Sequence, residues 1–598
     1  MKYFPIYFLL FITTYSNAQE YTDYLGAGHD TGIIVTSSNQ QSRTDWTEVA
    51  AAENTLNGQG MDARLLETSR FLAQATFGTD LAYIKTVSEG TFEEWIDAQF
   101  LLPETPVSMG DLTNDIYDEA KDLYYANGGE GSYSGPSYVH YTYAWWQTNM
   151  NNDDLLRQRV ALALSEILVI SSALDFQSHS GEGMGYYYDI LLDNAFGNYK
   201  DIITGVSLHP MMGRYLTHYS NPKSDLATNR FPDENYAREV MQLFTIGLDE
   251  LNQDGSYVLD GTDRIPTYGT DDVKEFAKIF TGLSAGASNI SGVTPSFNLD
   301  FRLADLSVPM AMYDAEHETG VKNLLNGYTV PSGQTGMEDV NDAIDHLFNH
   351  PNVGPFIAKR LIQRLVKSNP SPQYIAAVSA AFNNTNGVRG DMKGIIKAIL
   401  LHDEARSCGA VNNPNQGKMR EPMINYYNLV RQIGLSNPSG YDWNLSDNFF
   451  NRTAHRVLSS YSVFSFYLPS FSPNGPISDA GLVGPEYQIH DSNTSIGFIN
   501  AMNAYTSNQA AVYDGVSHLG ISDSTLDMVY LQYLAKDSEV LINHLDKLLT
   551  HGLLSNDTRQ IIKTALANFS GTDTAGQLDR AKMALYLIMN SPDYAILK

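Results

Sequence analysis

The stretch "LLRQRVALALSEILVISS", residues 155–172, decides the fold class of this chain. Apolar side chains occur on almost every side of the segment, a pattern that is typical of a helix buried within a large core. Arg159 and Glu166 interrupt the pattern seven positions apart and therefore lie on nearly the same side of a helix. Because a lone buried charge is very costly, both side chains are expected to find partners on another helix.

A second stretch, "ENYAREVMQLFTIG" at residues 234–247, offers such partners. At helical spacing, its polar side chains form one stripe, which consists of Asn235, Arg238, Glu239 and Gln242. We expect Arg238 and Glu239 to share a buried network with the two charges of the first stretch, completed by the two amides. The alternative is that the stripe is the solvated face of an ordinary surface helix, and periodicity alone does not separate the two.

Helix start signals recur along the rest of the chain. Thr91 with Glu94 three residues later is a capping box, and Ser371 followed by Pro372 is typical of a helix N-cap and first turn. "YAWWQ" at residues 143–147 is expected to open a helix that packs Trp145 and Trp146 into the core, and the alternative is that these aromatic side chains form a platform for a sugar ring or a polymer chain. The sequence therefore predicts a predominantly α-helical protein.

Long loops rich in Gly, Pro and aromatic residues separate these helices, at residues 126–141, 250–270, 284–335 and 434–448. Loops of this length are usually functional or specially packed, and they leave room for minor β structure. No internal repeat of fixed period is visible, which argues against a solenoid. Lys359, Arg360, Arg364 and Lys367 form a basic stripe on one predicted helix, and the simplest interpretation is a solvated face.

The N-terminus has the pattern of a secretory signal peptide. Lys2 precedes a short apolar run, and Ser16 and Ala18 occupy the positions expected before a cleavage site at Gln19. The run is shorter than the roughly 20 residues that a bilayer span needs. We therefore expect a signal peptide at residues 1–18, a polar extension at 19–61 and one large helical domain at 62–598. Export to the periplasm or the extracellular space would follow.

Composition excludes several classes of function. The formal net charge of −30 at pH 7 would repel phosphate backbones, so no nucleic-acid partner is expected. No later uncharged run is long enough to predict a transmembrane segment. The chain has no H-E-x-x-H motif, so we predict no metal site, and the sequence identifies no cofactor. Its single cysteine, Cys408, rules out an intramolecular disulfide, so packing alone must stabilise the fold.

The loop "YDAEHETG" at residues 313–320 is the most chemically suggestive one. It places Asp314, Glu316 and Glu318 around His317, and a carboxylate beside a histidine can orient the ring and raise its pKa for acid–base catalysis. The alternative is a solvated acidic loop in a protein that is already rich in acids.

Ordered blocks along the chain closely resemble the bacterial family DUF1800, a domain of unknown function. The blocks are "RFLAQATFG", "LRQRVALALSEILVIS", "NAFGNYKDIITGVSLHPMMGRYL", "FPDENYAREVMQLFTIGL", "TDDVKEFAKIFTGL", "HETGVKNLLNG", "HPNVGPFIAKRLIQRLVKSNP" and "SPDY". The resemblance implies a largely helical, exported protein. It also implies a possible partner protein that resembles sulfatases or phosphatases, since such proteins are often encoded beside this family.

The resemblance also marks positions. Asn235, Arg238 and Glu239 match the family's "ENYARE" block, while His317 and Lys322 match a block of the type HDxGxK together with Gly320. This chain has Glu318 where the family usually has Asp, which puts in doubt any role that needs the shorter side chain.

Two functions remain open. The first is a binding or assembly protein built on a helical scaffold. The second is an exported hydrolase of a polymer or ester, and its candidate catalytic residues are Glu239, Arg238, His317 and Asn235. Candidate binding residues are Asp314, Lys322, Arg159 and Glu166. Convergence of Glu239, Arg238 and His317 at one solvent-connected pocket would favour the hydrolase.

Overall fold

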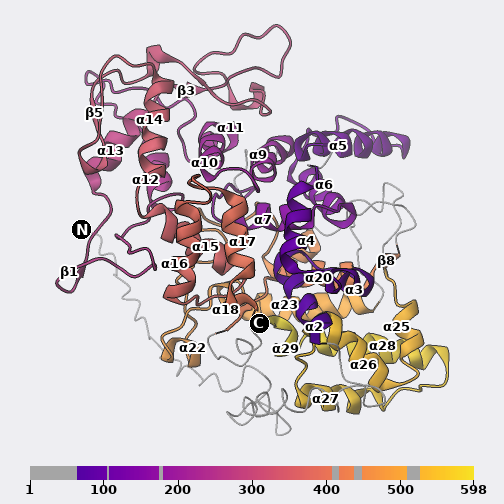
Figure 1. The fold of residues 1–598 in the computed structure, drawn as a ribbon. Coiled ribbons are helices and arrows are strands. Elements are labelled where there is room, and N and C mark those ends of the chain that lie inside the picture. Colours follow the sequence, from indigo (N-terminus) through magenta and orange to yellow (C-terminus); the bar gives the residue numbers. More distant parts are fainter. Residues whose placement is uncertain (1–62, 104–106, 174–179, 407–415, 437–446, 508–524) are drawn as a thin grey trace, which may run out of the picture.

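The computed structural model describes residues 63–103, 107–173, 180–406, 416–436, 447–507 and 525–598 (Figure 1). The predicted signal peptide at 1–18 and extension at 19–61 lie outside these residues. In the described part of the chain, no helix is both long and apolar enough to cross a membrane.

Helices form nearly all of the regular secondary structure of the described residues, and strands are limited to short antiparallel pairs. The pairs are β1 (Leu259–Asp260) with β2 (Asp263–Arg264), β3 (Leu283–Ser284) with β4 (Ala311–Met312), β5 (Lys322–Asn323) with β6 (Thr329–Val330), β7 (Lys418–Met419) with β10 (Ile596–Leu597), and β8 (Leu435–Ser436) with β9 (Thr525–Leu526). The predominantly helical fold with minor β structure is therefore confirmed.

The first stretch forms α7 (Leu155–Ser165), in which every side chain is buried. The predicted helix is too long, however, because α7 ends at Ser165 and Glu166 caps it. Beyond Glu166, partners elsewhere in the chain bind the backbone: the Tyr187 hydroxyl donates to the carbonyl of Leu168 (2.7 Å), and the N–H of Ser172 donates to the carbonyl of Leu458 (2.8 Å). These tertiary hydrogen bonds replace the helical ones that the sequence pattern suggests.

Helices from both halves of the chain surround α7. It packs against α2 (Ala63–Ala75), α4 (Phe92–Leu101), α9 (Gly181–Asp193) and α15 (Val353–Leu365). Two further helices, α16 (Pro372–Asn383) and α17 (Met392–Leu401), lie beside α15 (Figure 1). The centre of the molecule is therefore built from segments about 200 residues apart in sequence.

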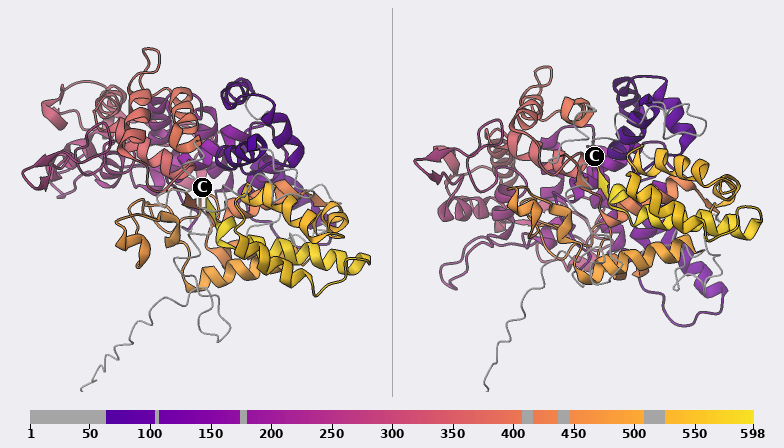
Figure 2. Two further views of the ribbon diagram at one scale, coloured as in Figure 1. Left: turned by 60° about the horizontal axis from the view of Figure 1, so that its bottom comes forward. Right: turned by 90° about the horizontal axis from the view of Figure 1, so that it is seen from below.

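The two ends of the molecule are built from different parts of the chain. One end holds α12 (Asn235–Gln242), α13 (Thr270–Ile279) and α14 (Gly336–Phe348). The C-terminal helices α25 (Val529–Leu534), α26 (Ser538–Leu545), α27 (Asn556–Leu566) and α28 (Thr574–Met589) lie at the other end in all views (Figures 1 and 2).

An aromatic cluster joins α6 (Tyr138–Asn151) to α20 (Pro422–Ile433) in the core. The ring of Trp146 stacks on that of Tyr427 with centroids 3.9 Å apart, and Trp145 meets the same ring edge-on at 5.1 Å. Both tryptophans are fully buried, which confirms their predicted place in the core. The predicted caps are also present, with the Thr91–Glu94 capping box on α4 and Ser371 capping α16.

Replacing Trp146 with Ala is expected to destabilise the protein by about 3–5 kcal/mol, because it removes a large buried ring and leaves a cavity. Chemical denaturation followed by circular dichroism measures the loss. Leu101→Ala is the control, since this leucine at the end of α4 is exposed and its removal should have little effect. Equal losses in the two variants would contradict the packing described here.

Candidate functional site

Glu166 and Arg364 form a buried ion pair where the end of α7 meets the last turn of α15. The Arg364 Nη1 lies 3.2 Å from the Glu166 Oε2, and its Nη2 donates to the backbone carbonyl of Glu166 at 3.1 Å. Arg159 joins the pair from one side, because its Nη2 donates to the carbonyl of Arg364 at 2.6 Å. The partners of the two charges on α7 are therefore on α15.

The predicted pairing of Arg159 and Glu166 with Arg238 and Glu239 is accordingly wrong. Arg238 is partly exposed and pairs with Glu234, one turn earlier on its own side of α12, at 3.0 Å. Asn235 is exposed, and its backbone N–H donates to Asp233. The polar stripe of α12 thus lies largely toward solvent, because its opposite face supplies Tyr236, Ala237, Val240 and Met241 to the core.

Glu239 is the one buried member of that stripe. Burial raises the pKa of its carboxyl, and the nearby charge of Arg238 opposes the rise. Its Oε2 has no hydrogen-bond partner in the described part of the chain. Gln242 accepts a hydrogen bond from the Tyr268 hydroxyl at 3.0 Å.

The Glu166–Arg364 pair belongs to a group of six charged side chains, which we call the charge cluster. They are Arg159, Glu166, Arg364, Lys418, Glu421 and Glu486, all buried. Lys418 binds both Glu421 (3.3 Å) and Glu486 (3.1 Å) through its Nζ. The cluster contains three cations and three carboxylates, so its charges balance inside the core, as the high cost of an unpaired buried ion requires.

The two neighbouring carboxyls Glu166 and Glu421 differ in proton affinity. Burial and the negative charge of Glu421 raise the pKa of Glu166, although Arg364 opposes them. Burial alone would raise the pKa of Glu421 too, but Lys418 and other neighbours hold it well below its usual range. The Tyr467 hydroxyl also donates to Glu421 at 2.8 Å. On acidification the pair therefore takes up its first proton at Glu166.

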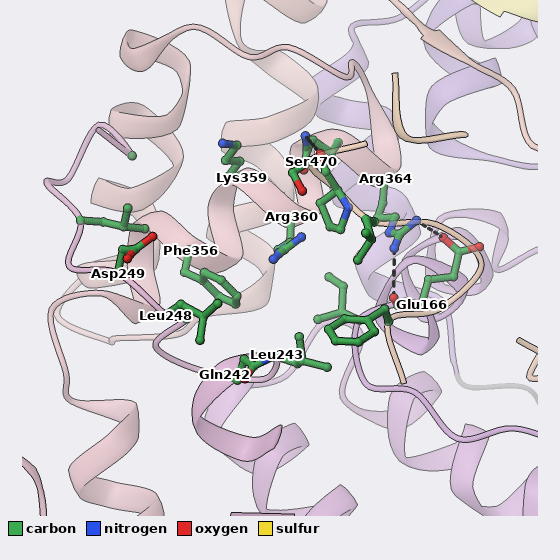
Figure 3. A pocket seen from close by; sticks show the side chains of 18 of the residues that line it. Glu166, Gln242, Leu243, Leu248, Asp249, Phe356, Lys359, Arg360, Arg364 and Ser470 are labelled. Atoms are coloured by element: carbon green, nitrogen blue, oxygen red, sulfur yellow. Dashed lines mark hydrogen bonds and ion pairs between the residues drawn. The ribbon is translucent and has the colours of Figure 1, made fainter. Parts of the chain in front are cut away.

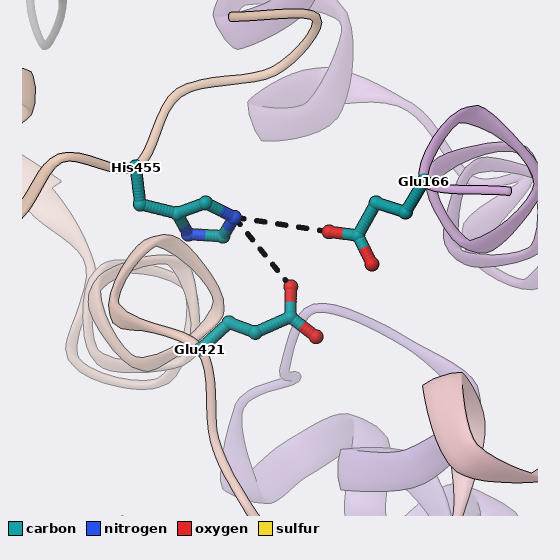
Figure 4. Close-up of side chains that lie close together, drawn as sticks. All are labelled: Glu166, Glu421 and His455. Carbon is teal, nitrogen blue, oxygen red and sulfur yellow. Dashed lines mark ion pairs between the residues drawn. The ribbon is translucent and has the colours of Figure 1, made fainter. Parts of the chain in front are cut away.

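His455 completes a group that has the composition of a metal site (Figure 4). Its Nε2 lies 3.7 Å from Glu166 and 3.6 Å from Glu421, and the three ligand atoms lie within 4.8 Å of one another. None of these three atoms has a hydrogen-bond partner among the described residues. A cation bound by one nitrogen and two oxygens would suit this arrangement on geometry alone.

Hydrogen bonding and charge favour a proton here instead. The backbone N–H of Met423 donates to His455 Nδ1 at 3.2 Å, so Nδ1 carries no proton and the neutral ring is protonated at Nε2. A ring that binds a metal through Nε2 needs its proton on Nδ1. A divalent cation would also leave an excess of positive charge, because Arg364 and Lys418 already neutralise the two carboxylates. The hydrogen bond to Nδ1 and the existing balance of charge therefore disfavour a divalent cation between Glu166, Glu421 and His455.

A cavity of about 460 Å³ opens beside the charge cluster (Figure 3). Its wall is formed by α15, by the segment that follows α12, and by residues 463–470. From α15 come Phe356, Lys359, Arg360, Gln363 and Arg364. A volume in this range is typical of small-molecule sites.

Arg360 is the least compensated charge of this cavity. It is partly exposed and points into the space, and the ring of Phe356 lies 4.8 Å from its guanidinium carbon (Figure 3). Burial and the positive charge of Arg364 lower the pKa of Arg360 to about 10. Among the residues that the structure describes, no carboxylate pairs with it. The other cations of the wall are Arg364, neutralised by Glu166, Arg264, which binds Asp249 at 3.3 Å, and Lys359.

The predicted solvated face of α15 is therefore only partly solvated. Arg364 and Lys367 are buried, and Lys367 binds Glu404 at 2.8 Å. Charge alone could not reveal this, because a basic stripe with buried partners and one with water look the same in a single sequence. The available signal is the i, i+4 pair Arg360 and Arg364 on a helix whose other residues are largely apolar.

His317 lies in a separate, closed network at the α14 end of the molecule. Its Nδ1 donates to the carbonyl of Thr281 at 2.8 Å, and its Nε2 lies 2.9 Å from Asp339 on α14. Lys322 binds the same carboxylate, and His317, Lys322 and Asp339 are each only about 1% exposed. The carboxylate that orients His317 is thus Asp339, 22 residues downstream, rather than one of the loop acids.

The loop acids have other partners. Asp314 is exposed and accepts the backbone N–H of Gly336 at 2.8 Å, and Glu318 accepts that of Ser224 at 2.7 Å. Arg238, Glu239 and His317 do not converge on the cavity, whose wall includes none of them. Their catalytic roles, like that of Asn235, remain predictions.

Addition of Zn²⁺ or Mn²⁺, or removal of metal with EDTA, is expected to leave the thermal unfolding midpoint unchanged, because the proton on His455 Nε2 and the balanced charges disfavour a cation. Differential scanning fluorimetry checks this. A midpoint that rises with added metal, by mass action, and no longer does so in His455→Ala would establish a metal site instead.

Glu421→Gln is expected to destabilise the protein by about 3–5 kcal/mol, because it removes one carboxylate from beside the buried Lys418. Glu166→Gln is the matched variant and should cost less, since burial already disfavours the charged form of Glu166. Urea denaturation of both variants at pH 7 tests the order. A larger loss for Glu166→Gln would contradict the assigned directions of the two pKa shifts.

The depressed pKa of Glu421 also fixes a pH dependence. Its contribution to stability is fully present above its unfolded pKa, about 4.3, and is lost as the pH falls toward its folded pKa. The stability difference between wild type and Glu421→Gln should therefore narrow as the pH is lowered from 7 to 3, as measured by urea denaturation. A constant difference over this range would show that Glu421 is not held ionised by the cluster.

Comparisons with known proteins support the family suggested by the sequence blocks. No curated protein matches the chain by sequence, and no solved structure matches it. The model of a family described as "Protein of unknown function (DUF1800)" matches residues 70–596, which is nearly the whole chain. The match includes α7, α12, α15 and the charge cluster, and the chain therefore belongs to the DUF1800 family.

Proposed function

We propose that the protein is a binding protein whose ligand is a small anion held in the cavity beside α15. The observation that carries this proposal is Arg360, a cation that points into the cavity without a carboxylate partner among the described residues. Since the chain as a whole carries a charge of −30, an uncompensated cation in a cavity is a strong local exception. Guanidinium groups bind carboxylate, sulfate and phosphate through paired hydrogen bonds.

The lowered pKa of Arg360 also supports a bound anion. Burial and the neighbouring Arg364 destabilise its charged form, as its lowered pKa indicates. A bound anion would supply the missing opposite charge, in a place where reduced solvent strengthens the attraction. Lys359 lies one residue away in the same wall and adds a second positive charge.

The residues around the cavity favour binding over catalysis. The two acids in its described wall, Glu166 and Asp249, are held in ion pairs with Arg364 and Arg264. In Figure 3, Arg364 lies between the Glu166 carboxylate and the open space. No histidine or cysteine belongs to the described wall, and its one serine, Ser470, pairs with no general base among the described residues.

We also propose that the protein is exported and acts with a partner resembling sulfatases or phosphatases. The signal-peptide pattern at residues 1–18 supports export. The partner is supported by the frequent encoding of such proteins beside members of this family. An anion cavity is compatible with such a partner, because sulfate and phosphate groups are both ligands for arginine.

Arg360→Gln is expected to weaken binding of inorganic sulfate and phosphate by about tenfold or more, the usual loss when a charge-assisted contact is removed. Isothermal titration calorimetry and ligand-induced shifts of the unfolding midpoint measure the effect. Arg302→Gln is the control, because it removes the same charge from a side chain that is 82% exposed and is not part of the cavity wall. Equal affinities of Arg360→Gln and wild type would overturn the proposal.

A further inference from the structure

We propose that the ligand of the cavity is an amphiphile, with a single anionic head group joined to an apolar chain or an aromatic ring. This inference rests on the anion-binding function proposed above and adds the chemical class of the ligand. It follows from the apolar side chains that lie around Arg360.

Large apolar side chains of the cavity wall are exposed to solvent. They are Leu248, Tyr257, Phe464 and Leu468, each between 38% and 56% exposed. Exposed apolar residues are common when they occur singly. These four instead come from two segments more than 200 residues apart and meet at one cavity.

The apolar and cationic groups share one space. In Figure 3, Phe356 and Leu248 lie side by side next to Arg360, and Leu243 lies below it. A ligand whose head group binds Arg360 would therefore place its body against these side chains. An inorganic anion would leave them in water.

The two cations of the wall that have no carboxylate partner among the described residues are adjacent in sequence, which favours a ligand with one head group. Arg364 and Arg264 are already neutralised by Glu166 and Asp249, which leaves Arg360 and, at the exposed edge, Lys359. The net charge of −30 on the whole chain disfavours a polyanion. The same charge repels an anionic membrane, so the ligand is a free amphiphile rather than a lipid in a bilayer.

The test compares probes that share a head group or a chain. Isothermal titration calorimetry with octyl sulfate, octanoate, inorganic sulfate and uncharged octyl glucoside is carried out below their micelle concentrations, and flotation with anionic phospholipid vesicles tests the membrane source. Each buried methylene strengthens binding by about fourfold, so octyl sulfate or octanoate should bind at least about tenfold more tightly than sulfate. Octyl glucoside, which lacks the charge, should bind at least about tenfold more weakly than octyl sulfate, and vesicles should not bind.

Two variants and a matched control locate the effect. Phe464→Ser and Leu248→Ser should each weaken octyl sulfate binding about threefold or more while leaving sulfate binding unchanged. Val529→Ser on α25 is the matched control, because this valine is 74% exposed and lies outside the cavity wall. All three side chains are exposed, so the unfolding midpoints should stay close to that of the wild type.

The possible failures are distinguishable. If sulfate binds through Arg360 and octyl sulfate binds no more tightly, the amphiphile is wrong and the anion site stands. If octyl glucoside binds as well as octyl sulfate, or if Val529→Ser weakens binding as much as Phe464→Ser, the amphiphile site is also wrong. If no probe binds in a way that depends on Arg360, both proposals fail. Binding to vesicles would replace the free amphiphile with a membrane lipid.

Discussion

The buried pair of Glu166 and Arg364 is the interaction on which the rest of the structure depends. It fixes the end of α7 against the last turn of α15, and α15 in turn supplies much of the cavity wall. Arg364 binds both the side chain and the backbone carbonyl of Glu166, so one guanidinium neutralises a carboxylate and satisfies a helix end. The position of Arg360, one turn earlier on α15, is set by the same contact.

The equal number of positive and negative charges in the charge cluster explains why its core side and its cavity side differ in chemistry. On the core side three cations lie among three carboxylates, and the His455 Nε2 lies 3.7 Å from Glu166 and 3.6 Å from Glu421. On the cavity side, Arg360 has no carboxylate partner among the described residues. A metal ion would add excess positive charge to the core side of the cluster, whereas an anion would neutralise Arg360 on the cavity side.

Sequence reasoning recovered the helical fold because capping and periodicity are local properties. The Thr91–Glu94 box, the Ser371 cap and the burial of Trp145 and Trp146 all follow from neighbouring residues. The need for partners at Arg159 and Glu166 was also evident, because desolvation of a charge is costly wherever it occurs. The helix that provides these partners could not be predicted, because Arg238 and Arg364 have the same chemistry. Only the packing of α7 against α15 determines which of them pairs with Glu166. The same limit applies to His317, whose partner Asp339 belongs to a different element.

The antiparallel pair of β7 and β10 has a consequence for the order in which the chain assembles. Lys418 lies opposite Leu597 in this pair, and the carbonyl of Ala595 accepts the N–H of Arg420. The strand that carries Lys418 is thus held in place by residues at the far end of the sequence, while the arginine on α7 that joins the same cluster is residue 159. Closing such long loops carries an entropic cost, and a ribosome synthesises residues 595–597 after every residue of the charge cluster. The edge that positions Lys418 can therefore form only once all six residues of the cluster have been synthesised.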